Sequence, residues 1–312
     1  MDLKGKLTRR EMLKLSGGVL AGASLLGVAG CGSSGGGSGS SASKTLTLGD
    51  IGWTENIAIN NLTRIVMGDE LGYDVVIKGP LDVGPLYQGV ASGDLDAFQD
   101  TWMPNHKVYL NKPQIEPRVE LLPKPWYEGK TEYGLTVLSY MKGITSIADL
   151  NHAGTNEITG IEPGAAFMPV IEKDVIPAYN LDMKLVTSST AGMLAELERK
   201  NAAKEPIVFT GWSPHWMNLK YDIVYLDDPK DAQGAFDNSS TVTSTVNADL
   251  KDNDPTAYTF LKSIRLDETQ VNQIEAEMNK AGSGNEEKGV RNWLKDNSQV
   301  VKPWVEAAKS AS

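Results

Sequence analysis

Residues 207–217 read IVFTGWSPHWM, an apolar run followed by a glycine and by two tryptophans four positions apart. Four strand-forming residues bounded by Gly and Pro predict a buried strand over 207–210. Trp212 then stands just past the end of that strand, in a chain that holds only seven tryptophans. Because so large a ring has little sheet left to cover there, its position raises the question of what it contacts.

Two further tryptophans occupy the same setting. Trp53 lies in GDIGWTEN (49–56) after the first predicted strand, and Trp102 lies in DTWMPNH (100–106) after a strand that ends near Phe98. In open α/β sheets the ligand crevice lies beyond the carboxyl ends of the strands, so the three rings could converge. A quaternary ammonium group has no N–H to donate and is held best by aromatic faces. The pattern therefore predicts an aromatic box built from Trp53, Trp102 and Trp212.

Strand-like and helix-like segments alternate along most of the chain, which is typical of an α/β fold. A first group comprises strands at 45–48, 73–77 and 95–98 and helices at 57–71 and 84–92. A second group comprises strands at 158–161, 184–187 and 207–210 and helices at 166–179 and 191–200. Strands at 133–140 and 241–246 could carry the chain out and back, and amphipathic helices at 257–264, 268–278 and 290–305 would close the first group.

The segment from residue 45 onward is roughly 265 residues long, which exceeds what one compact core supports, so two lobes are expected. Two crossings between two α/β lobes predict a hinged clamshell of the type II periplasmic-binding-protein architecture. We assign residues 45–137 and 240–312 to lobe I and residues 138–239 to lobe II. The cleft between the lobes is the natural place for a ligand.

The N-terminal segment has the order of a secretory signal: five basic residues, an apolar stretch over 15–29, and small residues before Cys31. Residues 8–14 (TRREMLK) resemble a twin-arginine signal, and Val28-Ala29-Gly30-Cys31 resembles a bacterial lipobox. We therefore expect a signal peptide over 1–30, lipidation of Cys31, and a Gly/Ser-rich tether over 31–44. The mature protein would be anchored on the outer face of the cytoplasmic membrane without spanning it.

Composition excludes several classes of function. The formal net charge is −10, and because the segment before Cys31 carries five basic and two acidic residues, the remainder carries −13. So acidic a chain does not suit nucleic acid. Cys31 is the only cysteine, and none of the three histidines lies in a metal-spaced or nucleophile-activating motif. We therefore expect no enzymatic activity, no cofactor and no metal.

Four motifs together resemble a known family: GWTEN (52–56), WMPNH (102–106), GIEPGAAFM (160–168) and GWSPHWM (211–217). They resemble the OpuAC-like glycine betaine and choline substrate-binding proteins of osmoprotectant ABC importers, over about residues 45–309. The resemblance implies a monomeric receptor that binds a quaternary ammonium compound and delivers it to a membrane permease. It also implies that Trp53, Trp102 and Trp212 enclose the trimethylammonium group, and that the betaine carboxylate is bound by His106 and by the backbone amides of Ala166 and Phe167.

The carboxylate-binding positions are also reasonable on physical grounds. A helix that opens after Pro163-Gly164 leaves N–H groups without intrahelical partners, and an anion is favoured there. The His106 side chain can donate a hydrogen bond to the same carboxylate. We expect His152 and His215 to be structural, and Trp126, Trp216, Trp293 and Trp304 to be packing residues.

Two residues favour choline over a carboxylated betaine. Tyr133 stands where choline-binding relatives have a fourth aromatic wall, and Glu55 resembles the acidic residue that they keep near the cation. Against choline, Ala165, Ala166 and Phe167 lack the Asn and Asp of a hydroxyl site. Glycine betaine, carnitine or proline betaine is therefore expected first and choline second; an amino-acid receptor and a non-transporting lipoprotein are further alternatives.

Overall fold

The computed structural model of the protein describes residues 44–234 and 240–311. The predicted signal peptide over 1–30, the predicted lipidation site Cys31 and residues 32–43 of the predicted tether lie outside the described residues. Within the described part, no helix combines the length and the apolar character that crossing a membrane requires.

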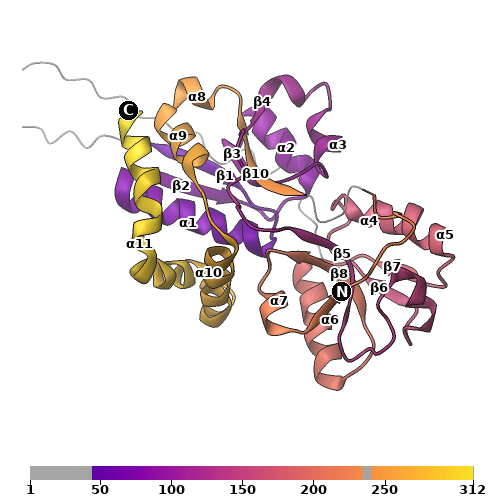
Figure 1. The fold of residues 1–312 in the computed structure, drawn as a ribbon. Coiled ribbons are helices and arrows are strands. Elements are labelled where there is room, and N and C mark those ends of the chain that lie inside the picture. The colour runs from indigo at the N-terminus through magenta and orange to yellow at the C-terminus, as the bar shows by residue number, and fades with distance from the viewer. Residues whose placement is uncertain (1–43, 235–239, 312) are drawn as a thin grey trace, which may run out of the picture. The chain divides into compact units, whose positions relative to one another are not determined.

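The first sheet has five strands in the spatial order β2-β1-β3-β10-β4 (Figure 1). Strands β1, β2 and β3 are parallel, and β10 runs antiparallel to both β3 and β4. β3 is almost entirely buried, as expected of a central strand covered on both faces. The bounds are β1 (Thr45–Gly49), β2 (Asp74–Lys78), β3 (Ala97–Met103), β4 (Val119–Leu121) and β10 (Thr241–Asn247).

The second sheet repeats this pattern with the spatial order β7-β6-β8-β5-β9. Strands β6, β7 and β8 are parallel, and β5 runs antiparallel to both β8 and β9. All six residues of β8 are buried, in agreement with the apolar run at 207–209. The bounds are β5 (Glu132–Leu138), β6 (Glu157–Thr159), β7 (Lys184–Val186), β8 (Val208–Ser213) and β9 (Ile223–Tyr225).

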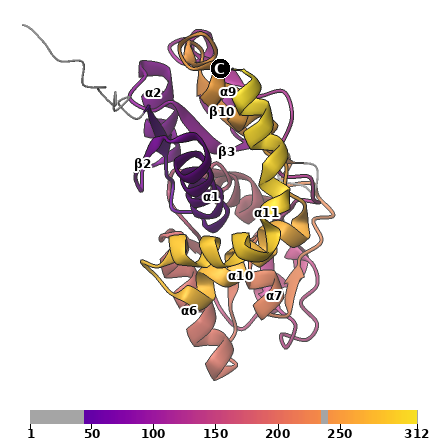
Figure 2. The same ribbon diagram turned by 90° about the vertical axis from the view of Figure 1, so that its left-hand side faces the viewer.

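The helices of the first sheet come from both ends of the described chain. In Figure 2, α11 lies beside α1 and α9, and α10 crosses below them. The C-terminal helices α10 and α11 therefore pack against α1 and each other, and α9 also contacts β10 of the first sheet. The bounds are α1 (Thr54–Leu71), α2 (Val83–Ser92), α3 (Lys107–Leu110), η1 (Glu116–Arg118), α8 (Leu250–Asn253), α9 (Pro255–Ser263), α10 (Glu268–Ala281) and α11 (Glu286–Ser310).

The helix predicted over 166–179 forms over 167–179, but it widens to a π-helical turn in its middle. Pro177 has no N–H to donate to the carbonyl of Lys173, which explains why regular α geometry is interrupted there. The bounds are η2 (Ile147–His152), α4 (Phe167–Val170), η3 (Ile171–Val175), α5 (Ile176–Tyr179), α6 (Thr190–Ala203) and α7 (Met217–Lys220).

The expected boundary between residues 137 and 138 requires a correction, because it cuts through β5. All seven residues of Glu132–Leu138 belong to the second sheet. Strand-forming residues show that a strand is present, but its hydrogen-bonding partners decide to which sheet it belongs. Below, "first lobe" means the first sheet with its helices (44–131 and 240–311), and "second lobe" means residues 132–234.

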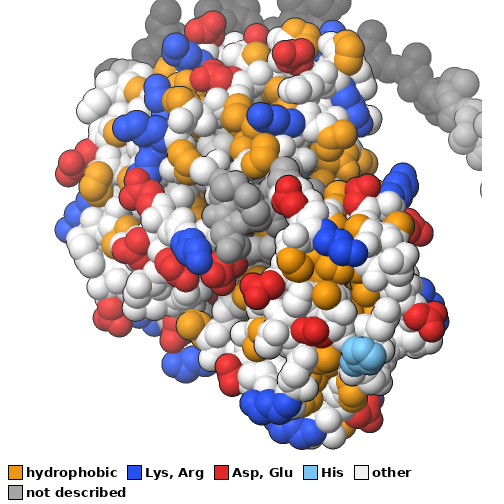
Figure 3. All heavy atoms as spheres, turned by 45° about the vertical axis from the view of Figure 1, so that its right-hand side comes forward, with side chains coloured by type: hydrophobic (Ala, Val, Ile, Leu, Met, Phe, Trp, Pro, Cys, Tyr) orange, Lys and Arg blue, Asp and Glu red, His pale blue; other side chains and the backbone are white. Residues whose placement is uncertain are grey.

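Three of the four tryptophans predicted to serve packing are buried in the hydrophobic core, and the fourth packs against it. Trp126, Trp293 and Trp304 are 2%, 3% and 3% exposed, and Trp216 is partly buried. The surface drawn in Figure 3 carries acidic and basic side chains interspersed, without a continuous basic area.

Candidate ligand-binding site

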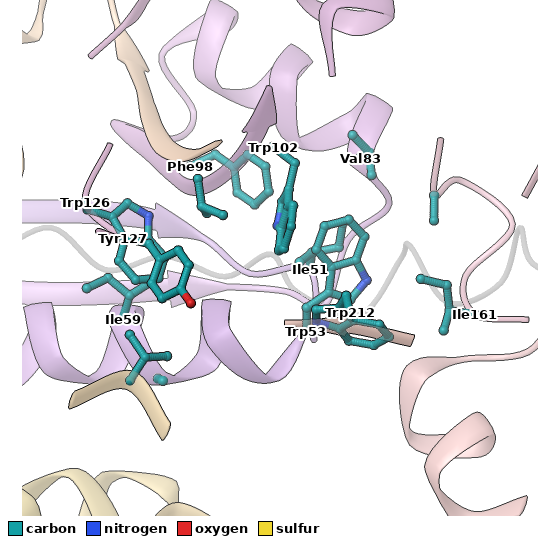
Figure 4. Packing of buried hydrophobic residues seen from close by; sticks show 14 of the residues in the cluster. Ile51, Trp53, Ile59, Val83, Phe98, Trp102, Trp126, Tyr127, Ile161 and Trp212 are labelled. Carbon is teal, nitrogen blue, oxygen red and sulfur yellow. The ribbon is translucent and has the colours of Figure 1, made fainter. Parts of the chain in front are cut away.

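The three tryptophans singled out by the sequence line one cavity of about 320 Å³, a volume that includes the open space at its mouth. Figure 4 shows the rings of Trp53, Trp102 and Trp212 gathered in one place, while Trp126 lies apart. Trp53 immediately precedes α1, Trp102 is the sixth residue of β3, and Trp212 is the fifth of β8. Both strands extend further than the sequence predicts, so Trp102 and Trp212 lie near the ends of strands rather than beyond them.

Tyr133 forms a fourth aromatic wall of this cavity. Its ring centroid lies 6.0 Å from that of Trp102 and 6.4 Å from that of Trp212. The register of β5 and β8 produces this arrangement, because it pairs Tyr133 with Trp212. A Cβ on Gly211 would collide with Thr136 of β5, so glycine at this position is what allows the two strands to approach.

Each of the three indole N–H groups donates to a carboxylate. Trp53 Nε1 is 3.1 Å from Glu162 Oε2, Trp102 Nε1 is 3.1 Å from Asp100 Oδ1, and Trp212 Nε1 is 3.2 Å from Glu55 Oε2. The indole has one donor and no acceptor. With that donor engaged, each ring offers only its apolar surface to the cavity, which suits a methylated cation.

Glu55 lines the cavity and is fully buried. Its Oε1 has no hydrogen-bond partner among the described residues. Burial raises the pKa of the Glu55 carboxyl to about 8, and the negative charge of Glu162 adds to the shift, although hydrogen bonds from its own backbone and from Trp212 oppose it. Burial also raises the pKa values of Asp100 and Glu275. Since no buried residue of the described chain is Lys or Arg, the surroundings of the cavity suit a cationic ligand group.

His106 lines the same cavity as a neutral donor. Burial lowers the pKa of its imidazole to about 3, so the ring carries no charge at neutral pH. The Trp102 backbone N–H donates to His106 Nδ1 at 3.3 Å, and the Tyr87 hydroxyl lies 2.8 Å from the same nitrogen. Because Nδ1 accepts, the proton must be on Nε2, which can donate to a ligand carboxylate.

The turn before α4 brings Ala165 and Ala166 to the cavity. The Ala165 N–H donates to Glu162 O at 2.9 Å, and the Met168 N–H donates to Ala165 O at 3.0 Å. The Ala166 N–H has no acceptor among the described residues; the anion-binding role expected of it stays a prediction. The Phe167 side chain does not line the cavity; its ring packs edge-on against Tyr133 at 5.0 Å, and the role expected of its amide stays a prediction.

Sequence reasoning missed three residues that line the cavity, namely Asn105, Ile161 and Ala165. Asn105 lies inside the WMPNH motif, and the other two flank the Glu162-Pro163-Gly164 turn, so their place in the motifs was the available signal. His215, expected to be structural, is buried and lies 4.8 Å from the Trp212 ring, whereas His152 is exposed. Burial of His215 is compatible with the structural role expected of it, and the role expected of His152 stays a prediction.

Comparison with known proteins identifies relatives of this chain. The glycine betaine/carnitine transport binding protein GbuC of Listeria monocytogenes is 35% identical over 164 residues, which cover 52% of this chain and 53% of GbuC. The chain is thus aligned with about half the length of that relative. The glycine betaine/proline betaine-binding periplasmic protein of Escherichia coli is 24% identical over 280 residues, which cover 78% of this chain and 84% of the relative.

Two solved structures have the same two-lobed fold. Lactococcal OpuAC, in its closed-liganded conformation complexed with glycine betaine, has a TM-score of 0.75 and 33% identity, covering 84% of this chain and 99% of that protein. An ABC-transporter choline binding protein in complex with choline has a TM-score of 0.74 and 28% identity, covering 86% and 97%. The two-lobed fold is thereby confirmed.

Residues 44–296 match the family described as the substrate binding domain of ABC-type glycine betaine transport systems. The relatives are binding proteins of ABC transporters rather than enzymes, which confirms the expected class of protein. The chain therefore belongs to the OpuAC family of substrate-binding domains.

Proposed function

We propose that this protein is the extracytoplasmic receptor of an ABC importer for a carboxylated quaternary ammonium compound, such as glycine betaine, carnitine or proline betaine. The observation that carries the proposal is one cavity that joins three indole rings to a neutral histidine donor. The rings suit the methylated cation, and His106 Nε2 suits the carboxylate of the same zwitterion. The relatives that bind glycine betaine support this assignment.

The cationic end would be held by Trp53, Trp102 and Trp212, with Tyr133 as a fourth wall. Cation–π contacts contribute about 0.5 to 2 kcal/mol each, and hydrogen bonds to a charged group contribute about 1.5 to 3 kcal/mol. The costs of ordering the ligand and closing the lobes must be subtracted from these gains. Micromolar affinity follows as the expected range.

The carboxylate end would be bound by His106 Nε2–H and by the backbone amides of Ala166 and Phe167. The described part of the cavity lining contains no Lys or Arg, so the carboxylate would be met by neutral donors. Neutral donors avoid placing a fixed positive charge next to the trimethylammonium group. This distribution matches a zwitterion whose two charges lie close together.

Choline is the second candidate, favoured by Glu55 and by the choline-binding structural relative. Its net positive charge would be compensated by an ionised Glu55. However, the pKa of about 8 keeps most of the Glu55 carboxyl protonated at neutral pH, which removes much of that preference. An amino-acid ligand, the remote alternative, would need several hydrogen-bond acceptors for its primary ammonium group, and aromatic walls do not supply them.

The ligand assignment is tested by calorimetric titration with glycine betaine, carnitine, proline betaine, choline and glycine. We expect at least one of the three carboxylated compounds to bind with micromolar affinity and glycine not to bind, because glycine lacks the methyl groups that the rings contact. Choline binding more tightly than all three carboxylated compounds would instead support the second candidate. Failure of every methylated amine to bind would contradict the proposed function.

The proposal extends to the cellular context. We propose that the chain is exported by its signal peptide, lipidated on Cys31, tethered by residues 31–44, and active as a monomer that delivers its ligand to a membrane permease. The two lobes would be the parts of a clamshell, with the boundary moved to before Glu132. Replacing Cys31 with Ala in cells should release the protein from the membrane fraction; retention of the variant there would contradict lipid anchoring.

A further inference from the structure

Two of the three indole–carboxylate hydrogen bonds join one lobe to the other. Trp53 of the first lobe donates to Glu162 of the second, and Trp212 of the second donates to Glu55 of the first. The third bond, from Trp102 to Asp100, lies within β3. Two of these indole bonds can therefore form only when the two lobes are in contact, whereas the third can form within the first lobe alone.

Glu162 is held in place by the second lobe itself. Its Oε1 accepts from the Thr190 backbone N–H at 2.7 Å, and its Oε2 accepts from the Thr190 hydroxyl at 2.9 Å as well as from Trp53. Thr190 is the first residue of α6, so the carboxylate is bound to the beginning of a 14-residue helix. Two bonds thus orient the acceptor independently of Trp53.

Glu162 differs from Glu55 because it does not line the cavity. We call the four rings of Trp53, Trp102, Trp212 and Tyr133 the aromatic cage. The Glu162 carboxylate contacts the N–H edge of Trp53 and is not among the groups that line the cavity. Glu162 can therefore act on the site in two ways: through its bond to Trp53, or through its negative charge, which adds to the raised pKa of Glu55. Through the bond, the role open to Glu162 is to position the Trp53 ring, not to contact the ligand.

Three further hydrogen bonds join the lobes near the cage. Thr54 Oγ1 lies 2.9 Å from His215 Nε2, the Tyr109 hydroxyl donates to Gly164 O at 2.7 Å, and the Trp216 N–H donates to Glu275 Oε2 at 2.6 Å. None of them involves a ring that lines the cavity. They hold the lobes together, whereas the Glu162 bond also fixes the orientation of a wall of the site.

We propose that Glu162 is a positioning residue that captures the Trp53 indole when the lobes come together, so that the aromatic cage is complete only in the closed protein. The inference rests on the proposed function and deepens it. When the lobes are apart, Trp53 has lost this acceptor and its ring can occupy other rotamers, which lowers its contribution to cation binding. Closure and cation recognition are then parts of the same step.

A double-mutant cycle with Glu162→Ala and Trp53→Phe tests this role, with glycine betaine as the ligand. Trp53→Phe keeps an aromatic face but has no N–H to donate. We expect Glu162→Ala alone to raise the dissociation constant about tenfold. In the Trp53→Phe background, the same change should cost less than twofold, because the bond is already absent. Equal losses in both backgrounds would overturn the proposal.

Two variants control for general damage to the turn. Glu162→Gln keeps one side-chain oxygen that can accept from the indole but loses the acceptor for the Thr190 N–H, so its affinity should lie between those of the wild type and Glu162→Ala. Asp100→Asn alters the matching bond inside β3 and should leave lobe closure unchanged. In small-angle scattering at saturating glycine betaine, Glu162→Ala should be more open than both controls; equal closure of all three would overturn the role in closure.

The failure of this proposal is distinguishable from failure of the proposed function. If wild-type protein binds no methylated amine, the same cycle is measured as unfolding free energies without ligand. A coupling between Trp53→Phe and Glu162→Ala would then still show that the bond joins the lobes, although the cage would serve another ligand. Absence of coupling in both measurements would overturn the positioning role.

Discussion

The two lobes have sheets of the same pattern but unequal chemistry. In each sheet three parallel strands are followed by one strand antiparallel to them and by an edge strand. Yet all buried carboxylates of the described chain, Glu55, Asp100 and Glu275, belong to the first lobe. The second lobe contributes rings and backbone amides to the cavity, from Trp212, Tyr133 and Ala166.

This difference indicates a division of roles between the lobes. The first lobe holds the buried acids, whose pKa values burial raises, together with Trp53 and Trp102, while the second lobe supplies Trp212, Tyr133 and the Ala166 amide. The lobes also depend on each other, because the Trp212 N–H is a hydrogen-bond donor to the buried Glu55. Substituting single side chains in one lobe at a time therefore tests how the two lobes divide the binding of the ligand.

Loss of a cage ring should have the largest effect. We expect Trp212→Ala to weaken glycine betaine binding on the order of hundredfold, and Trp102→Ala at least tenfold, since each removes a cation–π contact and opens the cavity to water. Trp212→Ala should cost more because it also removes the donor to Glu55. Calorimetric titration measures both, with circular dichroism as a control for folding. An unchanged affinity would remove that ring from the site.

His106 should show ligand-dependent effects. His106→Ala removes a neutral donor, so we expect glycine betaine to bind about tenfold more weakly and choline to be affected less than threefold, because choline has no carboxylate. The comparison is made by titrating both ligands into the same two proteins. Equal losses for the two ligands would mean that His106 shapes the cavity without binding the carboxylate.

The buried acid of the first lobe should make stability depend on pH. The pKa of Glu55 is raised to about 8 in the folded protein, whereas an unfolded glutamate ionises near 4.5. Between these values the unfolded state has lost a proton that the folded state keeps, so stability falls as pH rises from about 4.5 towards 8. Glu55→Gln removes this contribution. Between pH 5 and 9 the melting temperature of the variant should fall less than that of the wild type, by a few degrees; identical profiles would contradict the assignment.

A tryptophan outside the cavity should show the smallest effect on binding. The Trp126 indole donates to Gln99 O at 2.5 Å in the core of the first lobe. Trp126→Phe should reduce stability by about 1 kcal/mol through loss of this bond while changing glycine betaine affinity less than twofold. Thermal unfolding and calorimetry give the two values. A large loss of affinity would show that the first lobe transmits packing changes to the site.

Much of the site was predictable because motif position and chemistry agree. Trp53, Trp102 and Trp212 could be singled out since large rings near strand ends next to Gly or Pro have little sheet to cover, and His106 and Ala166 followed from the motifs. Glu162 could not be recognised from the sequence as the hydrogen-bond partner of Trp53. Its relation to Trp53 spans 109 residues and exists only where the lobes meet.

The sequence by itself determined the α/β alternation, the family and the aromatic residues of the cavity walls, because these depend on local patterning and short motifs. Only the tertiary structure decided that β5 belongs to the second sheet, that the buried acids gather in the first lobe, and that two indoles donate across the lobes. The physical reason is that hydrogen-bond pairing and burial depend on neighbours distant in the chain, and residue type at one position does not specify those neighbours.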